Sequence, residues 1–170
     1  MIVIVFGLPG SGKSYFASRF ASTINAVYIS SDKLRMKMLD KRTYSSTEKL
    51  SVYNEMLAQM REVGKQNKNL VLDATFYKSD IRKKFLEETE ENGNIIFIEV
   101  IADESLIRRR LKEEREDSEA DFKVYKDVKK EWEPLYEDHL ILQSTNDNIG
   151  EMLHKTADYL HSRNDKGTDK

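Results

Sequence analysis

The sequence predicts an α/β domain in which helices wrap a parallel β-sheet. Short apolar runs of strand length alternate with longer segments of helical periodicity, which is typical of this class. The chain contains no internal repeat and no Gly-, Ser- or Pro-rich linker. Its 170 residues, 39% of them hydrophobic, suffice for one such domain and are too few for two ordinary ones.

Five apolar runs are expected to form the strands of this sheet. Four of them are rich in Val and Ile, which is typical of parallel strands that are buried on both faces. The five runs are residues 2–6, 26–30, 69–73, 94–101 and, with a weaker pattern, 139–143.

The segments between these runs have the periodicity of helices that pack against a sheet. Residues 13–22 place Phe16 and Phe20 four positions apart, and residues 48–65 carry one apolar stripe. Several later segments begin with residues that commonly cap helices. These predicted caps are Ser45 with Glu48, Ser118 with Asp121, Ser79 and Asp103.

The two ends of the chain set the limits of the predicted domain. The last helix is expected over residues 148–160, whereas the polar residues 163–170 are expected to be disordered. The first apolar run, residues 2–6, lacks a basic leader and is far too short for a signal-peptide core or a membrane span. We therefore expect a domain over residues 1–162 that has no membrane segment.

Composition narrows the classes of site that the chain can carry. It has no cysteine, which excludes disulfides and thiolate metal sites, and a cytoplasmic protein is the simplest expectation. The net charge of −2 divides into +5 over residues 1–47 and −7 over the remainder. A basic amino-terminal third suits polyanionic ligands such as nucleotides, although a charged surface is often only a solvated one.

Residues 7–14, with the sequence GLPGSGKS, match the phosphate-binding pattern G-x-x-x-x-G-K-S/T. The motif follows the first predicted strand and precedes the first predicted helix, which is the context that it requires. Its backbone N–H groups and the positive end of the helix are expected to face phosphates. Lys13 is expected to bridge the β- and γ-phosphates, and Ser14 to ligate Mg²⁺. The predicted cofactor-binding residues are Gly7, Pro9, Gly10, Ser11, Gly12, Lys13, Ser14 and Tyr15.

Other residues must discriminate between GTPases, ATPases and kinases, because all three classes use this cradle. Guanine-specific proteins normally carry N-K-x-D, and the nearest approach, NKNL at residues 67–70, lacks the acid. Hydrolytic ATPases usually place a water-activating Glu after the strand-ending Asp, whereas Ala74 follows Asp73. Transfer to a second substrate needs an acceptor-side base. Asp32, after the second predicted strand, is a candidate, since both strand ends face the same crevice.

These residues, in this order, resemble a family of P-loop kinases. The family groups the polynucleotide 5′-kinase domain, archaeal seryl-tRNA kinase and zeta-toxin-like phosphotransferases. The resemblance spans roughly residues 1–143 and rests on GLPGSGKS, SSDKLR, VLDAT and an Arg-rich helix over residues 105–115. It implies a three-layer P-loop NTPase fold with a five-stranded parallel sheet in the order 2-3-1-4-5 and a helical lid around residues 103–120. It also implies ATP and Mg²⁺ as cofactors.

The resemblance implies roles for four further residues. Asp32 resembles the general base that takes the proton of the acceptor hydroxyl, a role worth about 10²–10⁴ in rate. The alternative is that Asp32 only caps the next helix. Arg35 resembles a clamp on the acceptor's own phosphate, since guanidinium binds phosphate in a bidentate way that Lys cannot copy. Asp73 has the position of the metal-side carboxylate, where it acts directly or through water, and the alternative is that it only ends a strand. Arg82 either meets substrate phosphate or lies on a solvated helix face.

The Arg-rich segment over residues 106–115 resembles the lid that closes over ATP in such kinases. Arginines there are expected to stabilise the charge on the transferring phosphoryl group. Arg108, Arg109 and Arg110 are consecutive, and neighbouring positions of a helix point about 100° apart, so they cannot all face one γ-phosphate. We expect Arg109 and Arg115 to be the catalytic arginines. The alternative is a surface helix with salt bridges.

The expected activity is transfer of the γ-phosphate of ATP to a hydroxyl, with an RNA or DNA 5′-hydroxyl as the leading acceptor. The acceptor is expected to enter over Asp32 and Arg35, against the basic stretch through Lys41 and Arg42. A small molecule such as a nucleotide sugar, an antibiotic or a metabolite is the second possibility, and an ATPase or switch without an acceptor is the third. Tyr15 departs from the family, in which many members have a small hydroxyl residue that touches the α-phosphate.

Overall fold

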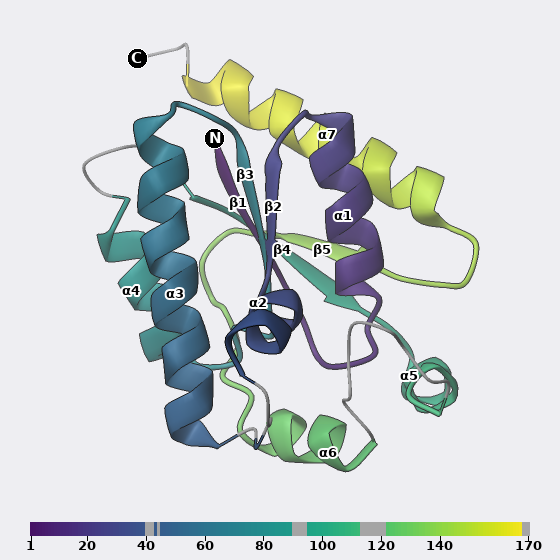
Figure 1. Cartoon of the computed structure of the whole chain (residues 1–170). Helices are drawn as coiled ribbons and strands as arrows, with labels where there is room; N and C mark the ends of the chain where they lie inside the picture. The colour runs from purple at the N-terminus through teal and green to yellow at the C-terminus, as the bar shows by residue number, and fades with distance from the viewer. Residues whose placement is uncertain (40–42, 44, 90–94, 113–121, 168–170) are drawn as a thin grey trace.

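A five-stranded parallel sheet forms the centre of the molecule (Figure 1). The computed structural model describes residues 1–39, 43, 45–89, 95–112 and 122–167. The strand order is β2-β3-β1-β4-β5, and all four pairings are parallel, which confirms the predicted order. The strands are β1 (Ile2–Phe6), β2 (Val27–Ser30), β3 (Leu70–Asp73), β4 (Ile95–Ile101) and β5 (Leu140–Gln143).

Helices cover both faces of the sheet because the strands are apolar on both sides. Val3 and Val5 of β1 belong to the apolar cluster on one face, and Ile4 and Phe6 to the cluster on the other, as the alternation of a strand requires. Among the described residues no helix is both long and apolar enough to cross a bilayer. The first face packs against α1 (Lys13–Thr23) and α7 (Ile149–Gly167), and the second against α3 (Ser46–Lys65) and α4 (Ser79–Glu87).

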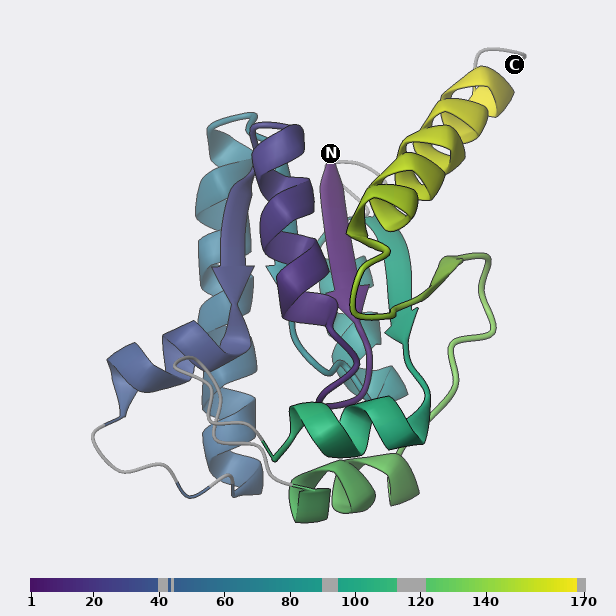
Figure 2. The same cartoon turned by 90° about the vertical axis from the view of Figure 1, so that its right-hand side faces the viewer.

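Three shorter helices gather at the carboxyl end of the sheet. They are α2 (Ser31–Met38), α5 (Glu104–Arg110) and α6 (Phe122–Lys130). Figure 2 shows α5 and α6 lying against each other below the strand ends. Ile107, Leu111 and Tyr125 form a small apolar cluster, against which Leu8 packs from the phosphate motif. The segment predicted as a lid thus packs against this motif over its described residues.

The last helix is longer than the sequence predicts. α7 continues to Gly167, whereas residues from 163 onward were expected to be disordered. Local contacts support the extension. The Ser162 hydroxyl donates to the Tyr159 carbonyl oxygen over 2.8 Å, and the Arg163 guanidinium donates to the Tyr159 hydroxyl over 2.9 Å. These side chain contacts offset the polar composition that favoured disorder.

The predicted helix caps differ in outcome. Ser45 caps α3 as predicted, because its hydroxyl accepts a hydrogen bond from the backbone N–H of Glu48 over 3.2 Å. Asp103 precedes α5 but makes no capping hydrogen bond with its side chain. Ser79 lies inside α4 instead of before it. Ser118 lies outside the described residues, as does its predicted partner.

Candidate active site

The phosphate motif forms a tight turn between β1 and α1. Gly10 and Gly12 have φ angles of +80° and +94°, in the left-handed region that favours glycine. At Gly7 a Cβ atom would lie 2.3 Å from the carbonyl oxygen of Val100, so no side chain fits there. Gly12 is the N-cap of α1 and offers no side chain to its free N–H groups. These N–H groups are therefore available to an anion.

Lys13 and Ser14 open α1 and lie beside Asp73, the last residue of β3. Asp73 is only 1% exposed, and Lys13 is also buried. The hydroxyl of Tyr28 donates to Oδ2 of Asp73 over 2.7 Å, whereas Oδ1 has no hydrogen-bond partner among the described residues. Burial raises the pKa of Asp73, and the Lys13 ammonium and the Ser14 hydroxyl lower it in part.

This arrangement fits a magnesium ion. An unpartnered, buried carboxylate oxygen beside a serine hydroxyl offers the oxygen ligands that Mg²⁺ prefers. The described residues contain no group of three or more His, Cys, Asp or Glu that could hold a metal by themselves. An ion here would complete its coordination with phosphate oxygens and water, as Mg²⁺ commonly does. Ser14 and Asp73 remain our proposed metal-side residues.

A cavity of about 720 Å³ adjoins the phosphate loop and is lined by Lys13 and Ser14. This volume is typical of small-ligand sites. We divide the cavity by the elements that line it. The nucleotide half includes Tyr15, Arg19, Arg110, Ser144, Thr145 and Asn148. The acceptor half includes Asp32, Arg35, Lys49, Tyr53, Tyr77 and Val128.

Arg110, at the end of α5, connects the phosphate loop to the loop after β5. Its guanidinium donates to the carbonyl oxygens of Ser11 over 3.0 Å and Thr145 over 2.7 Å. It also donates to the Ser144 hydroxyl over 3.1 Å. A cation is therefore fixed at the nucleotide half, where it faces the space next to the phosphate cradle.

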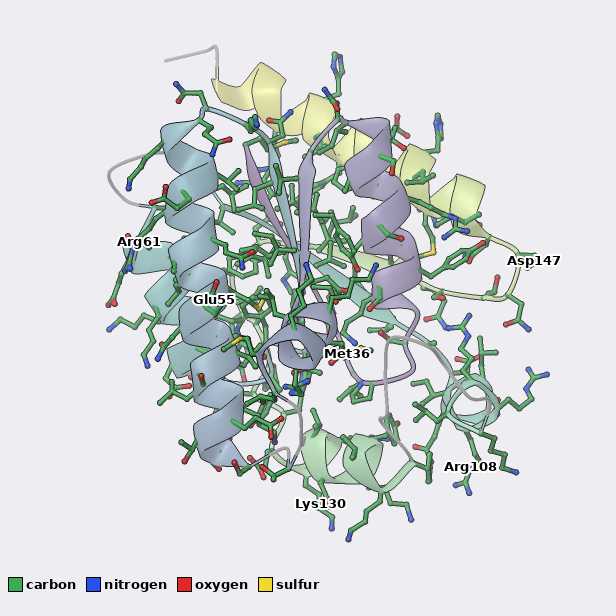
Figure 3. All side chains as sticks on the ribbon, viewed as in Figure 1. Met36, Glu55, Arg61, Arg108, Lys130 and Asp147 are labelled. Atoms are coloured by element: carbon green, nitrogen blue, oxygen red, sulfur yellow. The ribbon has the colours of Figure 1, made fainter. Side chains whose placement is uncertain are left out.

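The other lid arginines occupy different surroundings. Arg109, the expected catalytic residue, is exposed and is not among the residues that line the described cavity. Arg108 lies over the ring of Phe122 at 4.1 Å, and Figure 3 shows it on the outer side of α5. Arg115 lies outside the described residues. The structure thus places Arg110 at the site, whereas the sequence analysis expected its neighbour Arg109 there.

Tyr15 and Arg19 form a pair in the first turns of α1. The Tyr15 ring is 52% exposed, and the Arg19 guanidinium lies 3.4 Å from its centroid. Both residues line the nucleotide half of the cavity. Position 15 therefore presents an aromatic surface to the nucleotide half.

Asp32 and Arg35 lie one turn apart on α2 and form an ion pair. Nη1 of Arg35 lies 2.9 Å from Oδ1 of Asp32, and Nε of Arg35 lies 2.9 Å from Oε1 of Glu48 on α3. The guanidinium is buried between two carboxylates. Its expected role as a clamp on an acceptor phosphate is weakened, because two of its nitrogens already face negative charge. Lys41 and Arg42, the basic stretch expected beside the acceptor, lie outside the part of the chain that the structure describes.

The alternative role of Asp32 as a helix cap is corrected by the structure. α2 begins at Ser31, so its N-cap is Ser30 and Asp32 lies within the first turn. Its side chain, 29% exposed, lines the acceptor half of the cavity and does not close the helix end. A carboxylate that the helix end does not use is available to a ligand.

The wall of the acceptor half comes mainly from α3 and the segment after β3. The Tyr53 hydroxyl accepts from the Phe76 N–H over 3.0 Å and lies 3.3 Å from the Thr75 hydroxyl. Burial raises the pKa of Tyr53 to about 12, so it stays a neutral hydroxyl. The Lys49 ammonium lies 5.3 Å from the ring centroid of Tyr77. This wall combines aromatic rings with one cation.

Arg82 lies away from the cavity, in contrast to either expectation for it. It is 2% exposed and donates to the carbonyl oxygen of Phe76 over 2.7 Å. It also donates to the carbonyl oxygens of Glu133 and Pro134 over 2.8 and 3.1 Å. Arg82 therefore joins α4 to the segment after α6, and it neither meets substrate in this structure nor lies on a solvated face.

Two residues that the sequence analysis did not select are central to this site. Arg110 carried no signal of its own, because it is one of three consecutive arginines. Glu48 did carry a signal, but its position after Ser45 was interpreted only as a helix-capping pattern. Its burial beside Arg35 depends on the packing of α2 against α3, which no local pattern encodes.

The fold and the cavity together define a P-loop phosphotransferase class. A glycine turn after β1 presents α1 and Lys13 to phosphates, and a carboxylate after β2 lies in the same cavity. The family model of the AAA domain family AAA_33 matches residues 2–135. The chain therefore belongs to this family of P-loop kinases and is a phosphotransferase.

Solved structures with this fold include several kinases. A sugar kinase from Janibacter sp. superposes with a TM-score of 0.72 and 14% identity over 94% of each chain. A gluconokinase from Sinorhizobium meliloti gives a TM-score of 0.68 and 16% identity over 95% of each chain. The Pnkp1/Rnl/Hen1 RNA repair complex gives 0.62 and 23% identity over 76% of this chain and 42% of the other. Among curated protein sequences the chain has no match.

Proposed function

We propose that this kinase transfers the γ-phosphoryl group of ATP to an acceptor hydroxyl, with Asp32 as the base. The observation that carries the proposal is the shared cavity, which both Lys13 and Asp32 line. Asp32 also lies near enough to Asp73 to raise the pKa of that carboxyl. The candidate base is thus electrostatically coupled to the phosphate end of the site.

The proposed reaction is an in-line displacement at the γ-phosphorus. Asp32 accepts the proton of the acceptor hydroxyl while that oxygen forms its bond to phosphorus. The bond from phosphorus to the β–γ bridging oxygen breaks, and ADP leaves with this oxygen. Lys13 and the N–H groups of the glycine turn stabilise the charge that develops on the phosphates. Ser14 and Asp73 would hold Mg²⁺, which would supply positive charge to the phosphates.

The acceptor half favours a small hydroxyl compound over the polynucleotide end that the sequence placed first. Walls from both α3 and α6, including Val52 and Val128, border the space next to Asp32. Arg35 faces two carboxylates, so it is a poor site for a backbone phosphate. Lys33 and Lys49 both line the cavity, and these two cations suit a small acceptor with an acidic group. The similar sugar kinase and gluconokinase structures also favour a polyol acceptor.

A polynucleotide 5′-hydroxyl is the second candidate acceptor. The order of the sequence motifs over residues 1–143 supports it, and so does the similarity to the RNA repair complex. Binding of such an acceptor would weaken steeply with salt, because several phosphate contacts release counterions. Binding of a small acceptor with one charge would depend little on salt. Salt dependence therefore separates the two candidates.

The experiment that tests this function measures transfer from γ-labelled ATP with Mg²⁺ to a panel of acceptors. The panel contains sugars, sugar acids, nucleosides, tRNA and 5′-hydroxyl RNA and DNA oligonucleotides. We expect label on a small hydroxyl compound. Asp32→Asn should lower transfer by about 10²–10⁴, because the amide cannot accept the proton. ADP affinity should stay unchanged. Full transfer by Asp32→Asn, or release of free phosphate alone, contradicts the proposal.

A further inference from the structure

Glu48 is a buried carboxylate in the first turn of α3. Its side chain is only 6% exposed. One oxygen, Oε2, accepts hydrogen bonds from the backbone N–H and the hydroxyl of Thr43. The other, Oε1, lies 2.9 Å from Nε of Arg35. Both oxygens are therefore engaged, one by the loop before α3 and one by α2.

Glu48 reaches the proposed base through a single guanidinium. Arg35 presents Nε to Glu48 and Nη1 to Oδ1 of Asp32, both over 2.9 Å. The Arg35 side chain is 10% exposed, so water screens this bridge little. The Nη1 contact with Asp32 is a hydrogen bond, whereas the Nε contact with Glu48 is an ion pair without hydrogen-bond geometry. Glu48, Arg35 and Asp32 form a bridge between α3 and α2, which we call the α2–α3 bridge.

We propose that Glu48 is a positioning residue that orients Asp32 toward the acceptor hydroxyl through Arg35. The inference rests on the proposed function of Asp32. α2 has only eight residues, and its buried residues are Leu34 and Arg35. Without Glu48 the Arg35 guanidinium would lose one of the charges that hold it beside Asp32.

The charge of Glu48 supports the same role. Arg35 and Asp32 alone would form a pair with no net formal charge. With Glu48 on its other side, the guanidinium is shared between two carboxylates, and the α2–α3 bridge keeps a net negative charge. Glu48 therefore helps to hold the guanidinium beside Asp32 and adds negative formal charge to the α2–α3 bridge.

A purely structural role for Glu48 predicts a different result. A buried ion pair that serves only the fold changes the melting temperature when one partner is removed, and leaves the kcat of the folded enzyme unchanged. A positioning role changes kcat at constant nucleotide affinity, because displacement by about 1 Å can lower a rate about 10²-fold. Measurements of kcat and of the melting temperature therefore distinguish the positioning role from the purely structural role.

The test compares Glu48→Gln with the matched control Glu55→Gln. Glu55 lies on the same helix, and Figure 3 shows it on the outer side of α3, where its carboxylate accepts from Gln59 over 2.8 Å. We expect Glu48→Gln to lower kcat by about tenfold to 10²-fold with an unchanged KM for ATP and unchanged ADP affinity. Glu55→Gln should change neither. Equal kcat for both variants overturns the inference.

A second measurement tests the inference without any acceptor, and a second pair of variants tests it if Glu48→Gln does not fold. The crystal structures of the wild type and Glu48→Gln report the orientation of Asp32 without any acceptor. We expect the Asp32 carboxylate to turn away from its wild-type position in the variant, and an unchanged Asp32–Arg35 pair overturns the inference.

If Glu48→Gln does not fold, the double variant Arg35→Met with Glu48→Gln replaces it, with Arg35→Met alone as reference. The double variant should keep the kcat of Arg35→Met, and a further tenfold loss contradicts action through Arg35. Absence of transfer by the wild type refutes the proposed function alone.

Discussion

The two halves of the cavity are built from different parts of the protein. The phosphate end is made by a contiguous turn, residues 7–13, whose backbone provides the binding groups. The acceptor half is made by side chains of Asp32, Arg35 and Tyr53, which come from separate helices. Most substitutions leave the backbone N–H group in place, whereas every substitution replaces the side chain. Substitutions in the acceptor half should therefore alter catalysis or specificity without preventing nucleotide binding.

The largest effect is expected from Lys13, the cationic side chain of the phosphate turn. Lys13 is buried and lies close enough to Asp73 to lower the pKa of that carboxyl. Lys13→Ala should lower turnover by at least about 10²–10³, because it removes a preorganised cation from the phosphates. ATP turnover and ADP titration calorimetry measure this. Lys65→Ala, at an exposed lysine paired with Glu62, is the control and should have no effect. A loss under tenfold for Lys13→Ala contradicts the assignment.

An effect smaller than that of Lys13→Ala is expected from substitution of Arg110 in α5. Arg110→Met removes hydrogen bonds to the carbonyl oxygens of Ser11 and Thr145, and it frees the loop after β5. We expect nucleotide affinity to fall by about 10–100-fold, the equivalent of losing charged hydrogen bonds. Arg109→Met, at the neighbouring exposed position, should change it less than about twofold.

Calorimetric titration of ADP with both arginine variants measures the difference. The comparison is well matched, because both substitutions remove the same charge from the same helix and differ only in the direction of the side chain. A larger loss for Arg109→Met would restore the register that the sequence predicts. It would also show that α5 rotates when nucleotide binds.

The two halves of the cavity also differ in how far the sequence predicted them. The phosphate turn is local, so its residues and its place between β1 and α1 follow from the motif alone. The strand order was also confirmed, on the basis of family resemblance. Asp32 was selected because it lies just after a strand, and strand ends share one edge of a parallel sheet. The structure places it in the cavity, and its role as the base stays a prediction.

The remaining features depend on contacts between distant segments. Arg110 is selected over Arg109 by the packing of Ile107 and Leu111 against α6, which sets the rotation of α5. Arg82 is buried because the carbonyl oxygens of Glu133 and Pro134 lie beside it, 51 and 52 positions away. Neither contact has a local pattern. Periodicity can predict that a segment forms a helix, whereas the side of that helix that faces the cavity depends on the elements that pack against it.

The smallest effect, and one of opposite sign, is expected at Asp73. Burial raises the pKa of Asp73 above its unfolded value, so the ionised carboxylate destabilises the ligand-free fold. The sign follows from linkage: this penalty is absent at a pH below the unfolded pKa, where both states are protonated, and it grows as the pH rises through the folded pKa. An amide at this position resembles the neutral acid. It can still accept the hydrogen bond from Tyr28.

Asp73→Asn should therefore raise the melting temperature of the ligand-free protein at pH 7 by about 2–4 °C for each kcal/mol of relieved penalty. The gain should shrink as the pH falls toward the unfolded pKa of Asp. The same variant should lose the increase in ADP affinity that Mg²⁺ gives the wild type, because the unpartnered oxygen is no longer a carboxylate. Thermal unfolding over a pH series and ADP titrations with and without Mg²⁺ measure both effects, with the exposed Asp127→Asn as control. A lower melting temperature with full Mg²⁺ dependence would show that Asp73 stabilises the fold and lies apart from the metal.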